Sequence, residues 1–510
     1  MKKSIIFFFA LLLSFSVNAQ IQWQKCLGGT NDDYPYSIIL TYDSGFVVAG
    51  ESNSNDGNVT GNHGSYDYCI VKLDANGNVQ WQKSLGGSSY EVGYCIIQTY
   101  DSGYAVSGYT YSNDGDVTGN HGFYDYWVVK LNATGTIEWQ KSLGGTNDDR
   151  ANSIIQTFDS GYIVAGFSNS NDGDVIGNHG DYDYWVVKLN SSGSIQWQKS
   201  LGGTDDDEAS SIIQISDSGY VVAGYTFSND SDVMFNHGGF DCWIVKLDTL
   251  GTIQWQQSLG GTGSDGAYSI AETFDSGFIV GGISNSNDSN VTGNHGLRDY
   301  WVVKLNAFGN LDWQKCFGGT GYDKANSIIQ TSDSGYIVVG SSKSNDGDVT
   351  GNHGNEDYWV VKTDASGTIQ WQQSLGGTDG EFAFSVIQTY DNDYLVAGSA
   401  HSNNGDVIGN HGNDDFWLVK LGVATGIENN FTSNALHAHP NPSTDIFSIS
   451  ANTEFDNAQL NIFNAMGCNV YSERLSGETK VIDAENFSTG IYYVQIIKGE
   501  KMWAEKIIKQ

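Results

Sequence analysis

The feature that most constrains this chain is a unit of 58 residues that recurs seven times without insertion or deletion. Each unit contains one Trp-Gln pair and one Asn-His-Gly triplet at a fixed offset. The tryptophans are Trp23, Trp81, Trp139, Trp197, Trp255, Trp313 and Trp371. The histidines are His63, His121, His179, His237, His295, His353 and His411. A constant period of this length indicates one supersecondary unit copied along the chain.

One unit contains four stretches typical of β-strands: residues 93–99, 103–109, 124–131 and 136–143. Short Asp-Ser-Gly and Asn-x-x-Gly turns join the first pair and the last pair. A 13-residue polar loop, 111–123, joins the second strand to the third. Because the first three strands carry long apolar runs, we expect them to be buried on both faces, as stacked sheets require.

The order of the strands predicts a closed ring. The chain has a lone fourth strand at residues 21–27, before any hairpin, and its last unit stops after a third strand at 416–421. The early strand can therefore complete the last sheet, which leaves no open edge. We predict an all-β fold in which residues 20–421 form a seven-bladed β-propeller. Residues 422–435 form a linker, and 436–510 form a small β-sandwich.

The repeats resemble known propellers in two respects. A strand that precedes the first blade and completes the last one is similar to the arrangement of WD-repeat propellers. Residues 130–139, Lys-Leu-Asn-Ala-Thr-Gly-Thr-Ile-Glu-Trp, resemble the tryptophan docking motif of quinoprotein propellers. Quinoproteins usually have eight blades and often an adjacent cysteine pair near their cofactor. Neither is found in this sequence, so we expect no quinone.

The C-terminal region resembles the type A sorting domain of the type IX secretion system of Gram-negative bacteria. The matching residues, in order, are Pro440, Asn441, Pro442, Phe447, Gly467, Val470, Gly490, Ile491, Tyr492, Lys506, Ile507 and Ile508. The resemblance implies that the secretion machinery is a partner, that the chain crosses the outer membrane, and that this domain is then removed. It often implies attachment to a surface glycolipid. The alternative is a plain Ig-like adhesive module.

The first 19 residues are typical of an export signal. Lys2 and Lys3 precede an apolar stretch at 5–15, and Val-Asn-Ala at 17–19 suits cleavage. The apolar stretch is too short to span a bilayer, and we expect no transmembrane segment in the mature chain. Together with the sorting domain, this predicts an extracellular or outer-surface location in a Gram-negative bacterium, after Sec export and type IX secretion.

The formal net charge of −35 argues against nucleic acid as a partner, because a phosphate backbone would be repelled. Cations, neutral glycans and basic proteins stay open as ligands. We expect the protein to be a monomer.

Each unit has an aspartate four residues after its histidine. One histidine per blade does not gather the three or four ligands that zinc needs, so we interpret the pair as a hydrogen bond that orders the long loop. The repeat-signature residues that we interpret as structural are Trp81, Trp139, Trp197, His121, His179, Asp125 and Asp183.

The long loops also suggest calcium. Residues 112–116 read Ser-Asn-Asp-Gly-Asp, which places oxygen ligands around a glycine turn. The spacing differs from an EF-hand, and Asx turns that satisfy the loop backbone explain the same residues. Both interpretations stay open. The candidate ligands are Asp114, Asp116, Asp172, Asp174, Asp346 and Asp348, and no other cofactor is expected.

Two further charged positions recur in every unit, an acid after the Gly-Gly turn (Asp33) and a lysine in the third strand (Lys72). We interpret them as a repeated ion pair or a loop cap. Few residues break the repeat, and along the sequence they lie scattered over several blades without forming a recognisable site. They are Arg150, Met234, Phe235, Arg298, Lys324, Lys343 and His401.

Chemistry needs one asymmetric constellation, whereas these polar groups recur seven times, which disfavours catalysis. We therefore favour a non-enzymatic binding or adhesion propeller at the cell surface, with up to seven similar sites for a glycan or protein ligand. The alternative is a propeller enzyme that acts on extracellular polysaccharide. The sequence does not identify the ligand.

Overall fold

The structure is a computed structural model of the chain. It describes residues 19–423, 436–439, 443–444, 446–451, 458–464, 469–475, 479–498 and 501–509. The chain divides into two compact units, Met1–Val423 and Ala424–Gln510. Most of the expected export signal and nearly all of the expected linker lie outside the described residues. Among the described residues, no helix is long and apolar enough to cross a membrane.

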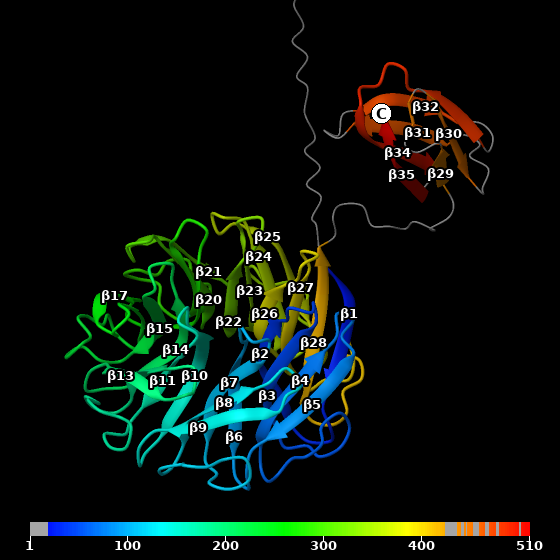
Figure 1. Cartoon of the computed structure of the whole chain (residues 1–510). Helices are drawn as coiled ribbons and strands as arrows, with labels where there is room; N and C mark the ends of the chain where they lie inside the picture. The colour runs from blue at the N-terminus through cyan, green and yellow to red at the C-terminus, as the bar shows by residue number, and fades with distance from the viewer. Residues whose placement is uncertain are drawn as a thin grey trace, which may run out of the picture. The chain divides into compact units, whose positions relative to one another are not determined.

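The first unit consists of seven four-stranded antiparallel sheets, the blades, which stand around a central axis (Figure 1). Blade 1 contains β2 (Asp33–Leu40), β3 (Phe46–Ser52), β4 (Asp67–Leu73) and β5 (Val79–Leu85). Blade 2 contains β6 (Glu91–Gln98), β7 (Tyr104–Thr110), β8 (Asp125–Leu131) and β9 (Ile137–Leu143). Blade 3 contains β10 (Asp149–Gln156), β11 (Tyr162–Ser168), β12 (Asp183–Leu189) and β13 (Ile195–Leu201).

Blade 4 contains β14 (Asp207–Gln214), β15 (Tyr220–Thr226), β16 (Asp241–Leu247) and β17 (Ile253–Leu259). Blade 5 contains β18 (Asp265–Glu272), β19 (Phe278–Ser284), β20 (Asp299–Leu305) and β21 (Leu311–Phe317). Blade 6 contains β22 (Asp323–Gln330), β23 (Tyr336–Ser342), β24 (Asp357–Thr363) and β25 (Ile369–Leu375). The predicted seven-bladed β-propeller is confirmed.

The last blade is made from both ends of the unit. Its strands are β26 (Glu381–Gln388), β27 (Tyr394–Ala400), β28 (Asp415–Val423) and, paired with β28, the early strand β1 (Ala19–Leu27). The first strands of all blades contact those of both neighbours, and β26 contacts β2. Leu27, Phe416 and Leu418 of blade 7 share an apolar cluster with Ile38 and Phe46 of blade 1.

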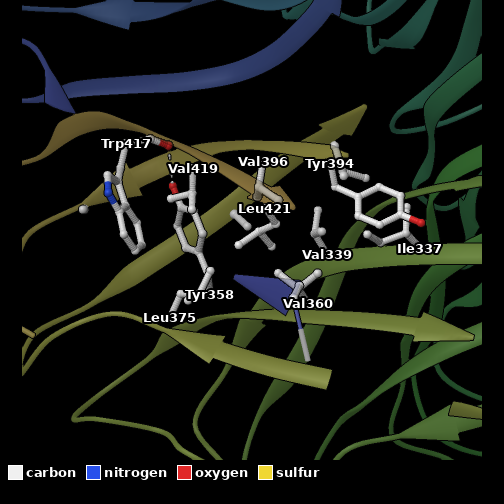
Figure 2. Packing of buried hydrophobic residues seen from close by; sticks show 14 of the residues in the cluster. Ile337, Val339, Tyr358, Val360, Leu375, Tyr394, Val396, Trp417, Val419 and Leu421 are labelled. Atoms are coloured by element: carbon white, nitrogen blue, oxygen red, sulfur yellow. Dashed lines mark hydrogen bonds between the residues drawn. The ribbon is translucent and has the colours of Figure 1, made fainter. Parts of the chain in front are cut away.

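Neighbouring blades are joined by aromatic residues of their third strands. Tyr68 of blade 1 packs on Trp127 of blade 2 with ring centroids 4.5 Å apart, and its hydroxyl donates to the Trp127 carbonyl oxygen at 2.9 Å. Figure 2 shows the same pair, Tyr358 and Trp417, between blades 6 and 7. Five of the seven junctions have this pair. Such pairs contribute about 0.5–1.5 kcal/mol beyond the area they bury.

The tryptophans of the outer strands also pack on the neighbouring blade, at the outer edge of the junction. Trp81 of blade 1 lies on Gly135, in the last turn of blade 2, where a Cβ atom would come within 3.1 Å of the indole. Gly135 has a φ of +76°, so the turn needs a glycine for its conformation as well as for the contact. Trp139 and Trp197 cover Gly193 and Gly251 in the same way.

The second unit contains two antiparallel sheets, in the orders β29-β30-β33 and β32-β31-β34-β35. The strands are β29 (Leu436–His439), β30 (Ile446–Ala451), β31 (Gln459–Asn464), β32 (Asn469–Arg474), β33 (Thr479–Asp483), β34 (Gly490–Lys498) and β35 (Lys501–Lys509). Its core includes Phe447, Leu460 and Val494.

The sorting-motif residues fall unevenly on this unit. Tyr492 is buried in the core, and Val470 on β32 is exposed. Gly490 begins β34, and Lys506 on β35 pairs with Tyr493. Pro440, Asn441, Pro442 and Gly467 lie outside the described residues.

Removal of residues 20–28 should destabilise the propeller strongly, because it leaves β28 with an unpaired edge and blade 7 without its outer strand. We expect aggregation, or a melting temperature at least ~10 °C lower, measured by calorimetry. The matched control is a deletion of residues 436–510, which leaves all seven blades complete. A β1-deleted protein whose propeller melts like that control would contradict the role of β1.

Candidate functional site: an axial cavity

The first strand of every blade faces the propeller axis and carries a β-bulge. In β10 the register with β11 shifts between Ala151 and Ser153, so Asn152 has no cross-strand partner. Gly166 stands opposite Ala151, and a Cβ atom at Gly166 would lie 2.0 Å from the Arg150 carbonyl oxygen. The glycine therefore permits the bulge, and the bulge re-aims the side chain of residue 152 toward the axis.

Two positions of the repeat consequently form two stacked rings around the axis. The bulge ring consists of Tyr36, Tyr94, Asn152, Ser210, Tyr268, Asn326 and Phe384. The ring two residues earlier consists of Tyr34, Val92, Arg150, Glu208, Gly266, Lys324 and Phe382. These positions carry four and seven different residue types, although the strands around them are nearly identical from blade to blade.

Members of both rings enclose a cavity of about 490 Å³. Phe167 and Tyr225, near the ends of β11 and β15, also line it, so it lies where these strands lead into the long loops. This volume is within the range of roughly 300–1,000 Å³ that is typical of small-ligand sites.

One side of the cavity is aromatic. The rings of Tyr36 and Tyr94 have centroids 4.7 Å apart, and those of Tyr36 and Phe384 are 5.2 Å apart. The Tyr36 hydroxyl donates to Glu51 at 2.7 Å, which fixes the ring against the wall. Blades 7, 1 and 2 thus present a continuous aromatic surface.

Blades 3 to 6 supply the polar and charged lining residues, together with Phe167, Tyr225 and Tyr268. Asn152 and Asn326 each donate one amide hydrogen to a carbonyl oxygen of the next blade, at 2.8 Å from Ala209 and Ala383. Burial raises the pKa of Glu208, although a hydrogen bond with Tyr225 acts the other way. Ser210 is the smallest side chain in the bulge ring.

Arg150 is clamped at the cavity wall. Its guanidinium carbon lies 4.6 Å from the ring centre of Tyr124 and 5.1 Å from that of Tyr109, and one terminal nitrogen contacts Asp148 at 3.2 Å. Its Nε atom is buried and has no hydrogen-bond partner among the described residues. One donor therefore stays unsatisfied in a side chain that is otherwise held rigidly.

Lys324 is the second cation of the cavity. Its ammonium lies 4.4 Å from the ring centre of Tyr268, and the described part of the chain provides no acidic partner within 4.0 Å. Burial lowers its pKa, and the nearby positive charge of Arg298 acts in the same direction. Arg298 itself lies over the Tyr322 ring at 6.0 Å.

These residues correct one interpretation of the sequence, namely that the departures from the repeat are scattered. Arg150 and Lys324 stand three periods apart and therefore occupy the same ring. Lys343 and His401 share another position, and their side chains lie 3.3 Å from Glu356 and 3.4 Å from Asp414. Met234 and Phe235 do not belong to this group and lie exposed in a long loop. An alignment of the seven units would have shown from the sequence that Arg150 and Lys324 occupy equivalent positions.

The invariant polar residues have internal partners instead. In each blade the histidine Nδ1 contacts the aspartate four residues later at 2.5–2.7 Å, as in His121 with Asp125 and His179 with Asp183. Asp33 accepts from the Gly29 amide at 2.8 Å and from Ser54 at 2.9 Å, and so caps the Gly-Gly turn. Lys72 pairs not with Asp33 but with Asp43, at 3.0 Å.

The candidate calcium ligands also contact the backbone. Asp114, Asp172 and Asp346 each accept at 2.8 Å from the amide that follows a Gly-Gly turn. Asp116, Asp174 and Asp348 accept more weakly, at 3.3–3.4 Å, from the first glycine of that turn. The described residues contain no group of three or more His, Cys, Asp or Glu that could hold a metal ion. Calcium binding stays a prediction.

Buried acids accumulate where blades meet. Burial raises the pKa of Asp33 and Asp207 to about 6 and that of Asp149 to about 7, while hydrogen bonds act the other way. A second acid lies nearby: Asp125 and Asp149 flank Gly144, and the charge of Asp125 raises the pKa of Asp149 further.

Comparison with known proteins identifies the C-terminal unit. Residues 437–510 match the family model of the secretion system C-terminal sorting domain. This match confirms the predicted type IX sorting domain, and the chain is thus secreted to the cell surface or the extracellular space.

Three further proteins have distant similarity to this chain. Regulatory protein FlaEY of Caulobacter vibrioides is 22% identical over 407 residues, 70% of this chain and 42% of that protein. The chain therefore spans less than half of that relative. PorZ of Porphyromonas gingivalis, a surface component of the type IX secretion system, is 12% identical, with 95% of this chain and 60% of that chain covered and a TM-score of 0.43. The WD40 domain of Neurospora crassa Pan2 is 11% identical, covers 79% and 96%, and has a TM-score of 0.44.

The buried acids predict that the propeller is more stable at pH 5 than at pH 8. Their folded pKa values lie above those of the unfolded chain, so the folded protein binds more protons between about pH 4 and about pH 7. The free energy of unfolding therefore decreases as the pH rises through this window. Calorimetry at several pH values measures the effect, and a melting temperature that increases from pH 5 to pH 8 would exclude it.

Asp149→Asn tests the same prediction at one junction. The amide keeps the shape of the side chain but cannot ionise. The free energy of unfolding should therefore depend less strongly on pH. The control is Asp181→Asn, an exposed carboxylate in the loop of the same blade, which should leave the dependence unchanged.

If calcium binds the long loops, millimolar Ca²⁺ should raise the melting temperature relative to excess chelator, because a ligand of the folded state stabilises it by mass action. Asp172→Asn should then reduce the increase. Identical unfolding curves with Ca²⁺ and with chelator would rule out the calcium interpretation.

Proposed function

We propose that this secreted chain is a binding protein, and that its propeller holds an extracellular ligand in the axial cavity. The observation that carries the proposal is the location of the variable residues. The position that differs most from blade to blade supplies Arg150, Glu208 and Lys324 to the cavity wall, whereas the invariant polar residues are bonded within the scaffold.

One asymmetric site accounts for these facts better than seven equivalent sites. Seven equal sites would need free polar groups in every long loop, but the loop carboxylates accept hydrogen bonds from the Gly-Gly turns. The axis is where all seven blades meet, so a single ligand there can contact seven different side chains. A rigid scaffold that presents such groups is typical of binding proteins.

A glycan is the ligand class that suits this cavity best. Its aromatic side can pack on the C–H face of a sugar ring, and its amides and hydroxyl can bond sugar hydroxyl groups. Binding of a surface or matrix glycan by a secreted protein would produce adhesion.

An enzyme that acts on extracellular polysaccharide is the second candidate, and Glu208 supports it. A buried carboxyl group with a raised pKa can act as a general acid. However, glycoside hydrolysis commonly uses two carboxyl groups, and Glu208 is the only carboxylate among the described residues that line the cavity. If the chain is such an enzyme, the wild type should release reducing sugar from a polysaccharide and Glu208→Gln should not.

Ser210→Tyr should block the cavity without harming the fold. The bulge ring already contains Tyr36, Tyr94 and Tyr268, so blade 4 can accept a tyrosine there. We expect the full chain to bind ligands on an array of extracellular glycans and peptides. The binding signal of the variant should be at least tenfold weaker. Its melting temperature should stay within about 2 °C of the wild type.

The control is Ser216→Tyr, in the exposed turn at the other end of the same hairpin, where other units carry Tyr42, Tyr100 and Tyr390. This variant should bind like the wild type. Equal loss of binding in both variants, or no bound ligand for the wild type, would overturn the proposal.

A further inference from the structure

We propose that the axial cavity recognises a saccharide terminus with a single carboxylate, and that Lys324 is the cation that binds this group. The inference rests on the proposed function, because it specifies the ligand class of the same cavity. Four properties of the described residues lead to it: an unpaired cation, its positive surroundings, an aromatic surface in the same cavity, and a strongly acidic scaffold.

Lys324 differs from Lys362, the lysine on the third strand of the same blade. Lys362 is buried, whereas Lys324 is half-buried, and the Lys362 ammonium lies 2.9 Å from Asp333 and 2.9 Å from the Thr363 carbonyl oxygen. For Lys324 the described residues provide only the face of Tyr268, at 4.4 Å. A half-buried cation is stabilised by a partner anion, and the open side of Lys324 faces the cavity.

The surroundings of Lys324 favour an anion. Arg298 is close enough for its charge to lower the pKa of Lys324, and the Arg298 Nε atom is buried without a hydrogen-bond partner in the described part of the chain. Glu356, whose charge acts on Lys324 in the opposite direction, is already paired with Lys343 at 3.3 Å. A ligand carboxylate would therefore supply the charge that this side of the cavity lacks.

The rest of the cavity favours a sugar over a simple acid. Tyr36, Tyr94 and Phe384, from blades 1, 2 and 7, form an aromatic surface in the same cavity. Asn152 and Asn326 each use one amide hydrogen within the scaffold, and each amide has a second hydrogen to donate. Aromatic rings, amides and a cation around one volume match a sugar ring that carries hydroxyl groups and a carboxylate.

The charge of the protein limits the ligand to few anionic groups. The formal net charge of −35 repels a polyanion, and Glu208 in the cavity disfavours a second carboxylate. The chemistry therefore fits a terminal acidic sugar rather than the interior of a polyuronate.

Stability measurements test the unpaired cation without any ligand. Lys324→Met removes a half-buried charge and keeps a side chain of similar length, so it should raise the melting temperature by about 1–2 °C. Lys362→Met in the same blade removes the cation of an ion pair and should lower it. A clear decrease for Lys324→Met would show that Lys324 has an internal partner and would overturn the proposal.

Calorimetric titration of the full chain tests the ligand. The probes are methyl glucuronide and methyl galacturonide, their neutral counterparts methyl glucoside and methyl galactoside, an oligosaccharide ending in glucuronic acid, and sodium acetate. We expect at least one acidic probe to bind tenfold more tightly than its neutral counterpart and more tightly than acetate. Tighter binding of the oligosaccharide than of the methyl uronides would identify the terminus of a glycan as the ligand. Equal affinity for both would identify a free sugar acid.

Lys324→Met should abolish this preference, and Lys324→Arg should keep most of it. Equal binding of acidic and neutral probes, or an unchanged preference in Lys324→Met, would overturn the carboxylate inference. In that case the array experiment with Ser210→Tyr still decides separately whether the cavity binds a ligand. Binding of acidic sugars that survives Ser210→Tyr would contradict both proposals.

Discussion

At five of the seven junctions the blades are held together by a contact between a tyrosine in the third strand of one blade and a tryptophan in the third strand of the next. The tyrosine hydroxyl donates to the tryptophan carbonyl oxygen, as Tyr126 does to Trp185 at 2.8 Å. A Cβ atom on Gly166 would lie 2.8 Å from that hydroxyl and 2.0 Å from the Arg150 carbonyl oxygen. The same glycine therefore admits the junction and the bulge that turns residue 152 toward the axis. Packing between blades and the shape of the cavity thus share one cause.

The other invariant residues keep each blade in register with its loops. At one end of a blade, the histidine–aspartate pair and the buried acid bind the long loop and the Gly-Gly turn. At the other end, lysines such as Lys72 bind the Asp-Ser-Gly hairpin. Buried acids cost stability when ionised, but they hold turns whose amides would otherwise be unsatisfied. These side chains all have partners within the scaffold, so the fold alone explains their sevenfold repetition.

The sequence predicts the blades well, because the 58-residue period, the apolar runs and the glycine turns all specify the same four strands. The first strands begin slightly earlier than expected, at Glu91 rather than residue 93 in blade 2, since pairing continues past the bulge. The bulge itself leaves no clear local signal. Without it, Asn152 and Ser210 read as ordinary strand residues, and Arg150 and Lys324 read as isolated exceptions. Their convergence depends on closure of the ring, which brings together residues 174 positions apart.

In a ring of near-identical units, residues can differ between units with little loss of stability only at positions that do not hold neighbouring units together. Substitution of Trp127 or Gly108 would disturb a junction, because the tryptophan is fully buried and the glycine admits a tyrosine hydroxyl. By contrast, one axial position carries a different residue type in each of the seven blades, and the pairing of the strands around it stays the same. In chain order the types are tyrosine, valine, arginine, glutamate, glycine, lysine and phenylalanine. The residues between the blades therefore determine whether the ring forms, and the residues at the axis can vary without disturbing it, as the proposed binding function requires.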